Sequence, residues 1–242
     1  MTPLILKVCG MRQEENIRQV EETLCRYASD RHRLHIRPWM GFIFYEKSPR
    51  YVTENPAYLP SDCKRVGVFV NEHSQKIKQR IREYGLHAVQ LHGNESPETC
   101  RDLRQSICND LHEDTKIIKA FSLSNEEDLH RVQEFEGACH YFLFDTKCSR
   151  YGGSGKKFDW SILRNYTGHT PFLLSGGIGP ADIADLQHFH HPQLAGYDLN
   201  SCFEKAPALK DPCLIEAFLQ SLSSSSEPVP YEDNGLQSES LS

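Results

Sequence analysis

Short runs of apolar residues alternate along this chain with longer stretches in which apolar residues recur every three or four positions. Most of the short runs lack the polar alternation of a half-exposed strand, which predicts strands buried on both faces, as in a parallel sheet. The longer stretches have the period of amphipathic helices. We predict strands at residues 4–8, 39–45, 66–70, 88–91, 116–120, 141–144, 172–174 and 195–199.

Helical stretches follow most of these strands, and Pro212 stands at the first position of the last one. The predicted helices are residues 14–25, 77–84, 97–106, 125–135, 158–163, 182–189 and 211–219. Eight strands in this order predict an α/β fold, a closed (β/α)8 TIM barrel. An open doubly wound sheet is the alternative, but no GxGxxG motif follows the first strand.

The domain organisation follows from length and local composition. One barrel domain over residues 1–221 fits a chain of 242 residues. Residues 27–37 are basic and have no helical or strand period, so we expect an extended, solvated loop there. Residues 222–242 have almost no apolar content, which predicts a disordered C-terminal tail.

Bulk composition excludes several classes of function. The 27 Lys and Arg against 33 Asp and Glu give a net charge of −6, which provides no general attraction to nucleic acid or anionic lipid. The 9 cysteines include no CxxC pair, which indicates reduced thiols. The first apolar run is too short for a signal peptide, and no segment reaches transmembrane length. We therefore expect a soluble, cytoplasmic protein.

The sixth predicted strand ends at an acid and passes into a glycine-rich loop. Asp145 follows the run YFLF, and Gly152, Gly153 and Gly155 come shortly after it. Because catalytic groups of α/β folds collect at the carboxyl ends of strands, Asp145 is a candidate catalyst. The alternative is a loop acid that only caps the next turn.

Two further strand ends carry groups suited to an anionic ligand. Arg50 closes the turn KSPR after the second strand, where its guanidinium could bind a carboxylate or phosphate, or pair locally on the surface. Gly176 and Gly177 precede a predicted helix and could hold a phosphate through their N–H groups, although two glycines alone specify little. The histidines, His188 among them, fall mostly on helices or loops, so we predict solvated side chains and no metal site.

Seven further runs are distinctive, namely KVCGM at 7–11, GFIFYEKSPRYV at 41–52, VGVFVNE at 66–72, VQLHGNES at 89–96, DTKCSRYGGSGKKFDWSIL at 145–163, LLSGGI at 173–178 and KDPCLIEAF at 210–218. Taken together, these runs resemble the phosphoribosylanthranilate isomerase family, the barrel enzymes of tryptophan biosynthesis. They follow one another in a fixed order over most of residues 4–219, which makes the resemblance specific although no single run would decide it.

The resemblance implies an Amadori rearrangement of N-(5-phosphoribosyl)anthranilate to 1-(2-carboxyphenylamino)-1-deoxy-D-ribulose 5-phosphate, without metal or organic cofactor. By position, it makes Cys9 the general base and Asp145 the general acid; the residues alone would indicate only a buried structural thiol at Cys9. It places Arg50 on the anthranilate group. The remaining substrate-binding residues that it implies are Gln90, His92, Gly153, Ser154, Gly176, Gly177, Asn200 and Ser201.

These roles set physical requirements. Asp145 must be protonated to donate to the ribose ring oxygen, which requires burial to hold its pKa above about 3.9. Cys9 must become a thiolate to remove the C2 proton, which requires a positive field because an ordinary thiol has a pKa of about 8.5. The family often has Ser-Ser-Gly where this chain has Asn200-Ser201-Cys202. If that glycine takes a positive φ, Cys202 would strain or reshape the phosphate loop.

Three alternatives remain open at this point. An indole-glycerol-phosphate synthase would need a lysine acid on its strands, and a ribulose-phosphate epimerase would need a metal site with histidines at strand ends. A barrel that binds its phosphosugar without turnover would leave Cys9, Asp145 and Arg50 unexplained. The expected partner is a small phosphosugar substrate, with no nucleic acid or membrane, and the chain is expected to be a monomer or homodimer.

Overall fold

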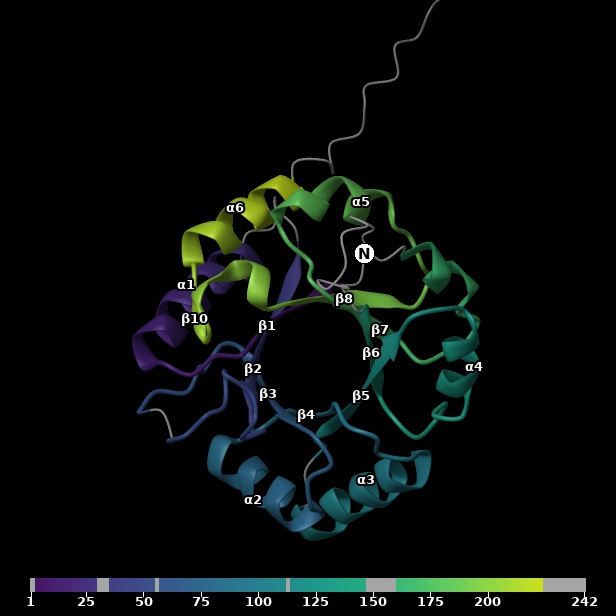
Figure 1. Ribbon diagram of the computed structural model, residues 1–242. Coiled ribbons are helices and arrows are strands. Elements are labelled where there is room, and N and C mark those ends of the chain that lie inside the picture. The colour runs from purple at the N-terminus through teal and green to yellow at the C-terminus, as the bar shows by residue number, and fades with distance from the viewer. Residues whose placement is uncertain (1–2, 30–34, 55–56, 112–113, 147–159, 224–242) are drawn as a thin grey trace, which may run out of the picture.

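Eight parallel strands form a closed barrel in the order of the sequence, with helices around it (Figure 1). The computed structural model describes residues 3–29, 35–54, 57–111, 114–146 and 160–223. This arrangement confirms the predicted (β/α)8 barrel. The strands are β1 Leu4–Cys9, β2 Ile36–Ile43, β3 Lys64–Phe69, β4 Ala88–Leu91, β5 Lys116–Leu123, β6 Tyr141–Thr146, β7 Phe172–Leu174 and β8 Leu194–Leu199.

The barrel closes where β8 pairs with β1. Val8 lies opposite Leu199 in this parallel ladder, and Cys9 lies opposite Gly41 on the other side of β1. Gly196 allows the closure, because a Cβ atom at its position would lie 1.9 Å from the carbonyl oxygen of Ile5. A side chain there would therefore push the two strands apart.

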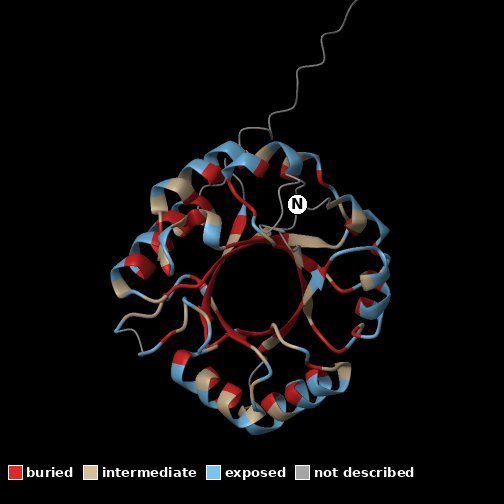
Figure 2. Cartoon of the chain, in the orientation of Figure 1, coloured by how far each residue is buried: buried red, intermediate tan, exposed pale blue. Residues whose placement is uncertain are grey.

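Helices cover the outside of the barrel and bury only their inner faces, as Figure 2 shows. A two-stranded hairpin, β9 Glu204–Ala206 and β10 Leu209–Lys210, follows β8 and lies beside α1 in Figure 1. The α-helices are α1 Glu14–Ser29, α2 Ser74–Tyr84, α3 Pro97–Leu111, α4 Glu127–Gln133, α5 Ile183–His188 and α6 Pro212–Ser223. The 3-10 helices are η1 Trp160–Asn165, η2 Pro180–Asp182 and η3 Ser201–Phe203.

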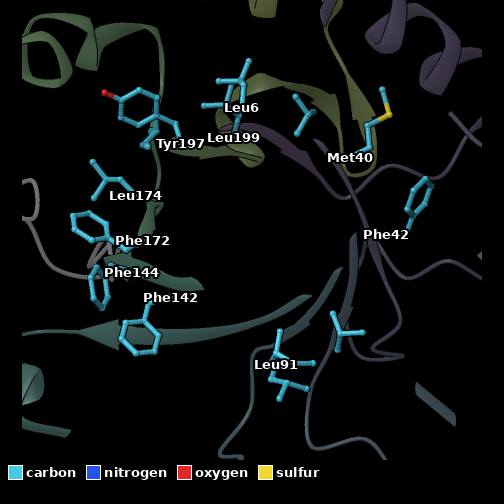
Figure 3. Close-up of a cluster of buried hydrophobic side chains, with 14 of the residues drawn as sticks. Leu6, Met40, Phe42, Leu91, Phe142, Phe144, Phe172, Leu174, Tyr197 and Leu199 are labelled. Carbon is cyan, nitrogen blue, oxygen red and sulfur yellow. The ribbon is translucent and has the colours of Figure 1, made fainter. Parts of the chain in front are cut away.

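Two apolar layers explain why the strand sequences lack polar alternation. Phe142 and Phe144 point away from the barrel into the layer beneath the helices, together with Phe172 (Figure 3). Leu143, between them in the chain, points inward and packs with Ile118 from β5. Both faces of β6 are therefore buried, as in other parallel sheets covered by helices.

The connection between α1 and β2 is shorter than the loop predicted at residues 27–37. Helix α1 continues to Ser29 and β2 begins at Ile36, while residues 30–34 lie outside the described part. Tyr27 is buried and its hydroxyl donates to the carbonyl oxygen of Glu216 in α6, which extends α1 beyond its local apolar pattern.

The boundary placed after residue 221 also needs correction. Helix α6 runs to Ser223 and buries Leu222, so the folded part includes at least these two residues. Residues 224–242 lie outside the described ranges. None of the helices in the described ranges has the length and apolar content needed to cross a membrane.

Candidate active site

The predicted site residues come together at one rim because all eight strands are parallel. Cys9 ends β1, Arg50 lies in the turn after β2, and Asp145 lies at the end of β6. His92 follows β4 and Asn200 follows β8. Gly153 and Ser154 lie outside the described residues.

The Cys9 thiol is buried in the mouth of the barrel, where 3% of the residue is exposed. It packs with Ile43 and Val68 from the next two strands. Gly41 provides the space for it, because a Cβ atom at that position would lie 2.7 Å from the Cys9 sulfur. Strands β2 and β3 therefore form an apolar wall on one side of the thiol, with a glycine opposite it on β2.

A buried ion pair from β1 and β8 lies beside this thiol. The Lys7 ammonium donates to Asp198 Oδ1 at 2.7 Å, and the Ser175 hydroxyl donates to Asp198 Oδ2 at 3.2 Å. Burial raises the pKa of the Cys9 thiol, while the positive charges of Lys7 and Lys210 act to lower it. The net shift is upward, so the protein without substrate favours the neutral thiol.

Arg50 lies above the same strand end, held by a second set of charges. Its Nε and Nη2 atoms donate to the Glu204 carboxylate at 2.6–3.0 Å. The Lys210 ammonium donates to the same carboxylate at 2.5 Å and to Asn200 Oδ1 at 2.9 Å. Burial alone would raise the pKa of Glu204, but hydrogen bonds from Arg50 and Lys210 hold it below its ordinary value.

Sequence reasoning missed four of these charged residues, namely Lys7, Asp198, Glu204 and Lys210. For Lys7 and Asp198 a signal was present, because each interrupts a strand that is otherwise buried on both faces, and a charge there needs a partner. Glu204 and Lys210 belong to the short β9–β10 hairpin, which has no periodic pattern.

Asp145 faces His92 across the rim, with 3.4 Å between Oδ2 and Nε2. Gln90 Nε2 lies 3.0 Å from His92 Nδ1. If Gln90 donates this bond, a neutral His92 carries its proton on Nε2 and points it at Asp145. The Asp145 side chain is 33% exposed, so the burial expected for it is only partial.

The loops after β7 and β8 touch each other. Gly176 and Gly177 have φ angles of 93° and 78°, which only glycine adopts easily, and the Cys202 thiol donates to the Gly177 carbonyl oxygen at 3.3 Å. Cys202 lies in η3 and has no positive φ, so the strain expected from a cysteine at this position is not found. Asn200 directs its side-chain oxygen to Lys210.

Metal ligands do not cluster in the part of the chain that the structure describes: no group of three or more His, Cys, Asp or Glu residues there could hold an ion. The described polar side chains at this rim are acids, bases and hydrogen-bond donors at strand ends. This set can move protons between defined positions and hold an anion.

Comparisons with known proteins identify the family of this chain. Residues 7–221 match the family described as N-(5'phosphoribosyl)anthranilate (PRA) isomerase. The N-(5'-phosphoribosyl)anthranilate isomerase of Phocaeicola vulgatus is 50% identical over 219 residues, which are 90% of this chain and 98% of the relative. The crystal structure of phosphoribosyl anthranilate isomerase from Thermotoga maritima is similar with a TM-score of 0.70 and 31% identity, covering 90% of this chain and 98% of that one.

A second solved structure is a phosphoribosyl anthranilate isomerase in complex with reduced 1-(o-carboxyphenylamino)-1-deoxyribulose 5-phosphate. It is similar to this chain with a TM-score of 0.69 and 29% identity, and the match covers 90% of this chain and 98% of that one. The family match includes the second half of β1, all of β2 to β8, and the strand ends that carry Cys9, Arg50 and Asp145. On these grounds the chain belongs to the N-(5'-phosphoribosyl)anthranilate isomerase family.

Proposed function

We propose that this chain performs the isomerase reaction of its family with Cys9 as general base and Asp145 as general acid. Membership of the family makes it an enzyme of tryptophan biosynthesis that converts N-(5-phosphoribosyl)anthranilate to 1-(2-carboxyphenylamino)-1-deoxy-D-ribulose 5-phosphate. The observation that carries the assignment of roles is the placement of a thiol and a carboxyl group at the ends of β1 and β6, on one rim.

The acid step opens the ribose ring. Protonated Asp145 donates to the ring oxygen while the bond from that oxygen to C1 breaks, and the lone pair of the anthranilate nitrogen forms a C1=N bond. The product is an open-chain iminium ion with one positive charge. His92, 3.4 Å from Asp145, can donate a hydrogen bond to the carboxylate once Asp145 has given up its proton.

The base step makes the product. Once the Cys9 thiol has released its own proton to solvent, the thiolate removes the proton from C2, and the electrons of that bond neutralise the iminium to give an enolamine. Protonation at C1 and loss of the proton from the C2 hydroxyl then give the ketone. Lys7 and Lys210 act to lower the Cys9 pKa against the effect of burial. The iminium charge favours the thiolate further, so ring opening prepares the base.

Substrate binding divides among three strand ends. Arg50 is assigned to the anthranilate carboxylate. Gln90 is buried and its Oε1 atom has no partner within the described ranges, so it is assigned to a sugar hydroxyl, next to His92. The phosphate is assigned to the loops after β6, β7 and β8, whose residues are Gly153, Ser154, Gly176, Gly177, Asn200 and Ser201.

We place the enzyme in the cytoplasm, which agrees with its family and with the lack of a membrane-crossing helix among the described residues. Either a monomer or a homodimer is compatible with the comparisons. A related structure is described as mutually generated monomers of the dimeric enzyme from Thermotoga maritima.

The test is turnover of freshly made phosphoribosylanthranilate, coupled to indole-glycerol-phosphate synthase. Cys9→Ala and Asp145→Asn should each lower kcat by about 10²- to 10⁴-fold, the usual contribution of a positioned acid or base. Binding of the reduced product analogue should change far less. Cys213→Ala and Asp185→Asn, at exposed positions on the outer helices, are the matched controls and should keep full activity.

Two results would contradict these roles. Equal losses in kcat and in analogue binding would show that Cys9 and Asp145 support the structure and take no part in the proton transfers. A folded parent protein that binds the analogue without turning over substrate would favour a barrel that only binds its phosphosugar.

A further inference from the structure

We propose that Glu204 is a positioning residue that orients Arg50 toward the carboxylate of the substrate. The inference rests on the proposed function, which assigns that carboxylate to Arg50. Glu204 begins β9 and Arg50 lies in the turn after β2, so the contact joins segments 154 residues apart.

The geometry fixes one edge of the Arg50 guanidinium and leaves another available. Nε and Nη2 form the side edge, and both donate to Glu204. The end edge, made by Nη1 and the second hydrogen of Nη2, has no protein acceptor within the described ranges. A planar guanidinium can bind a carboxylate on each of these edges. Because the group is rigid, a carboxylate bound to the side edge fixes the direction in which the end edge points.

Glu204 is itself held from two further directions. The Lys210 ammonium and the backbone N–H of Ala208 both donate to its Oε1 atom. Lys210 is anchored in turn, because the side chain of Asn16 in α1 bonds both its backbone N–H and its carbonyl oxygen. The hairpin therefore presents a carboxylate of fixed orientation to Arg50, and Glu204 has a side chain that is only 5% exposed.

This assembly lies directly next to the proposed base. A Cβ atom on Gly10, the residue after Cys9, would be 2.7 Å from Arg50 Cδ and 3.4 Å from Lys210 Nζ. Gly10 has a φ of 81° and no side chain, which lets the Arg50 stem lie against the end of β1. A carboxylate on the end edge of Arg50 would therefore be bound within the same strand-end cluster as the thiol.

The sign of the effect separates orientation from charge. Glu204→Gln removes one negative charge and makes the site more positive, which by charge alone should tighten the binding of an anion. It also replaces a carboxylate oxygen with an NH₂ group, which cannot accept a hydrogen bond from Arg50. The guanidinium is then no longer held by two hydrogen bonds along its side edge. If Glu204 acts by orientation, binding of the carboxylate must weaken despite the more positive site.

The experiment measures calorimetric binding of two ligands to the full chain. One is reduced 1-(o-carboxyphenylamino)-1-deoxyribulose 5-phosphate, and the other is the same compound made from aniline, which lacks the carboxylate. Glu204→Gln should weaken the first by about 10- to 100-fold and the second by less than about threefold, as expected for a misplaced contact. In turnover, KM should rise while kcat changes by less than about threefold. Glu14→Gln, at an exposed ion pair with Arg18, is the matched control.

A double-mutant cycle with Arg50→Met completes the test. If Glu204 acts through Arg50, the double variant should bind the carboxylate ligand no more weakly than Arg50→Met alone. Additive losses, equal weakening of both ligands, or tighter binding by Glu204→Gln would overturn the inference. If Arg50→Met weakened the two ligands equally, the assignment of Arg50 to the carboxylate would fail instead. Thermal unfolding shows whether each variant is folded. If Glu204→Gln does not fold, Glu204→Asp takes its place, because the shorter side chain moves the carboxylate away from Arg50.

Discussion

The ion pair of Lys7 and Asp198 offers a direct test of how this barrel stabilises charge. The two side chains are 0% and 6% exposed and lie 2.7 Å apart inside the barrel mouth. Lys7→Met keeps much of the volume of the lysine stem but removes the ammonium. The Asp198 carboxylate then keeps its hydrogen bond from Ser175 and loses its counter-charge.

We expect a large loss of stability from this single change. Breaking a buried pair by removing one partner costs about 3–5 kcal/mol, because a charge remains buried without compensation. For a chain of this length that lowers the melting temperature by about 6–20 °C. Lys7→Met with Asp198→Asn removes both charges and should recover part of the loss.

Equilibrium unfolding in urea measures these differences, with an exposed pair as control. Arg18 and Glu14 lie 2.9 Å apart, but their side chains are 49% and 41% exposed. Arg18→Met should therefore cost about 1 kcal/mol or less, from the loss of this ion pair and of the contact between the guanidinium and the Tyr58 ring. A Lys7→Met loss no larger than that of Arg18→Met would refute the argument from burial.

The pH dependence of the Lys7 contribution has a defined sign. Burial lowers the pKa of Lys7, but its charge and hydrogen-bond interactions with Asp198 and Cys9 outweigh the effect of burial, and the pKa is raised. A raised pKa means that the folded state binds the proton more tightly, so the contribution is complete below about pH 10.4, the unfolded value. It is lost only as the pH rises further, so the difference between parent and Lys7→Met should be flat from pH 6 to 9.

Three further outcomes are expected. Burial raises the pKa of Cys9, so the rate of its alkylation by iodoacetamide should rise about tenfold per pH unit from pH 7 to beyond about 8.5. The rate is measured from the mass of the modified peptide, and a plateau near pH 7 would contradict this expectation. Gly41→Ala should cost about 1–3 kcal/mol in urea unfolding by crowding the Cys9 sulfur, and Cys9→Ala should relieve part of that cost. Cys202→Gly should change KM by less than about threefold, because the thiol bond to Gly177 is weak and Cys202 has no strained φ, and a larger shift would show that the thiol shapes the phosphate loop.

The local sequence predicts the barrel well because burial on both faces leaves a clear signal. The run at 88–91 and the run at 172–174 coincide with β4 and β7. The ends of other elements were less clear, since they depend on contacts between distant segments. Tyr27 belongs to α1 because it packs against α6, and nothing in the basic stretch around it shows that contact.

The site was only partly predictable for the same reason. Parallel strands bring their carboxyl ends to one rim, so Asp145 and Arg50 could be placed there from their positions alone. The partner of Arg50 could not, because Glu204 lies 154 residues away in a hairpin without a periodic pattern. The role of Cys9 came from the family resemblance, since the sequence shows only a thiol at the end of a buried strand.

The charges around Cys9 also indicate the order of the two chemical steps. The described groups beside it are three cations, Lys7, Lys210 and Arg50, and two carboxylates, Asp198 and Glu204, which leave one excess positive charge. A bound substrate carboxylate on Arg50 would cancel that excess, so a thiolate formed then would make the cluster negative. Ring opening adds the positive iminium and restores the balance. The thiolate is therefore most favourable after the acid step, when the C2 proton becomes acidic, and this order follows from the same charges that hold Arg50 in place.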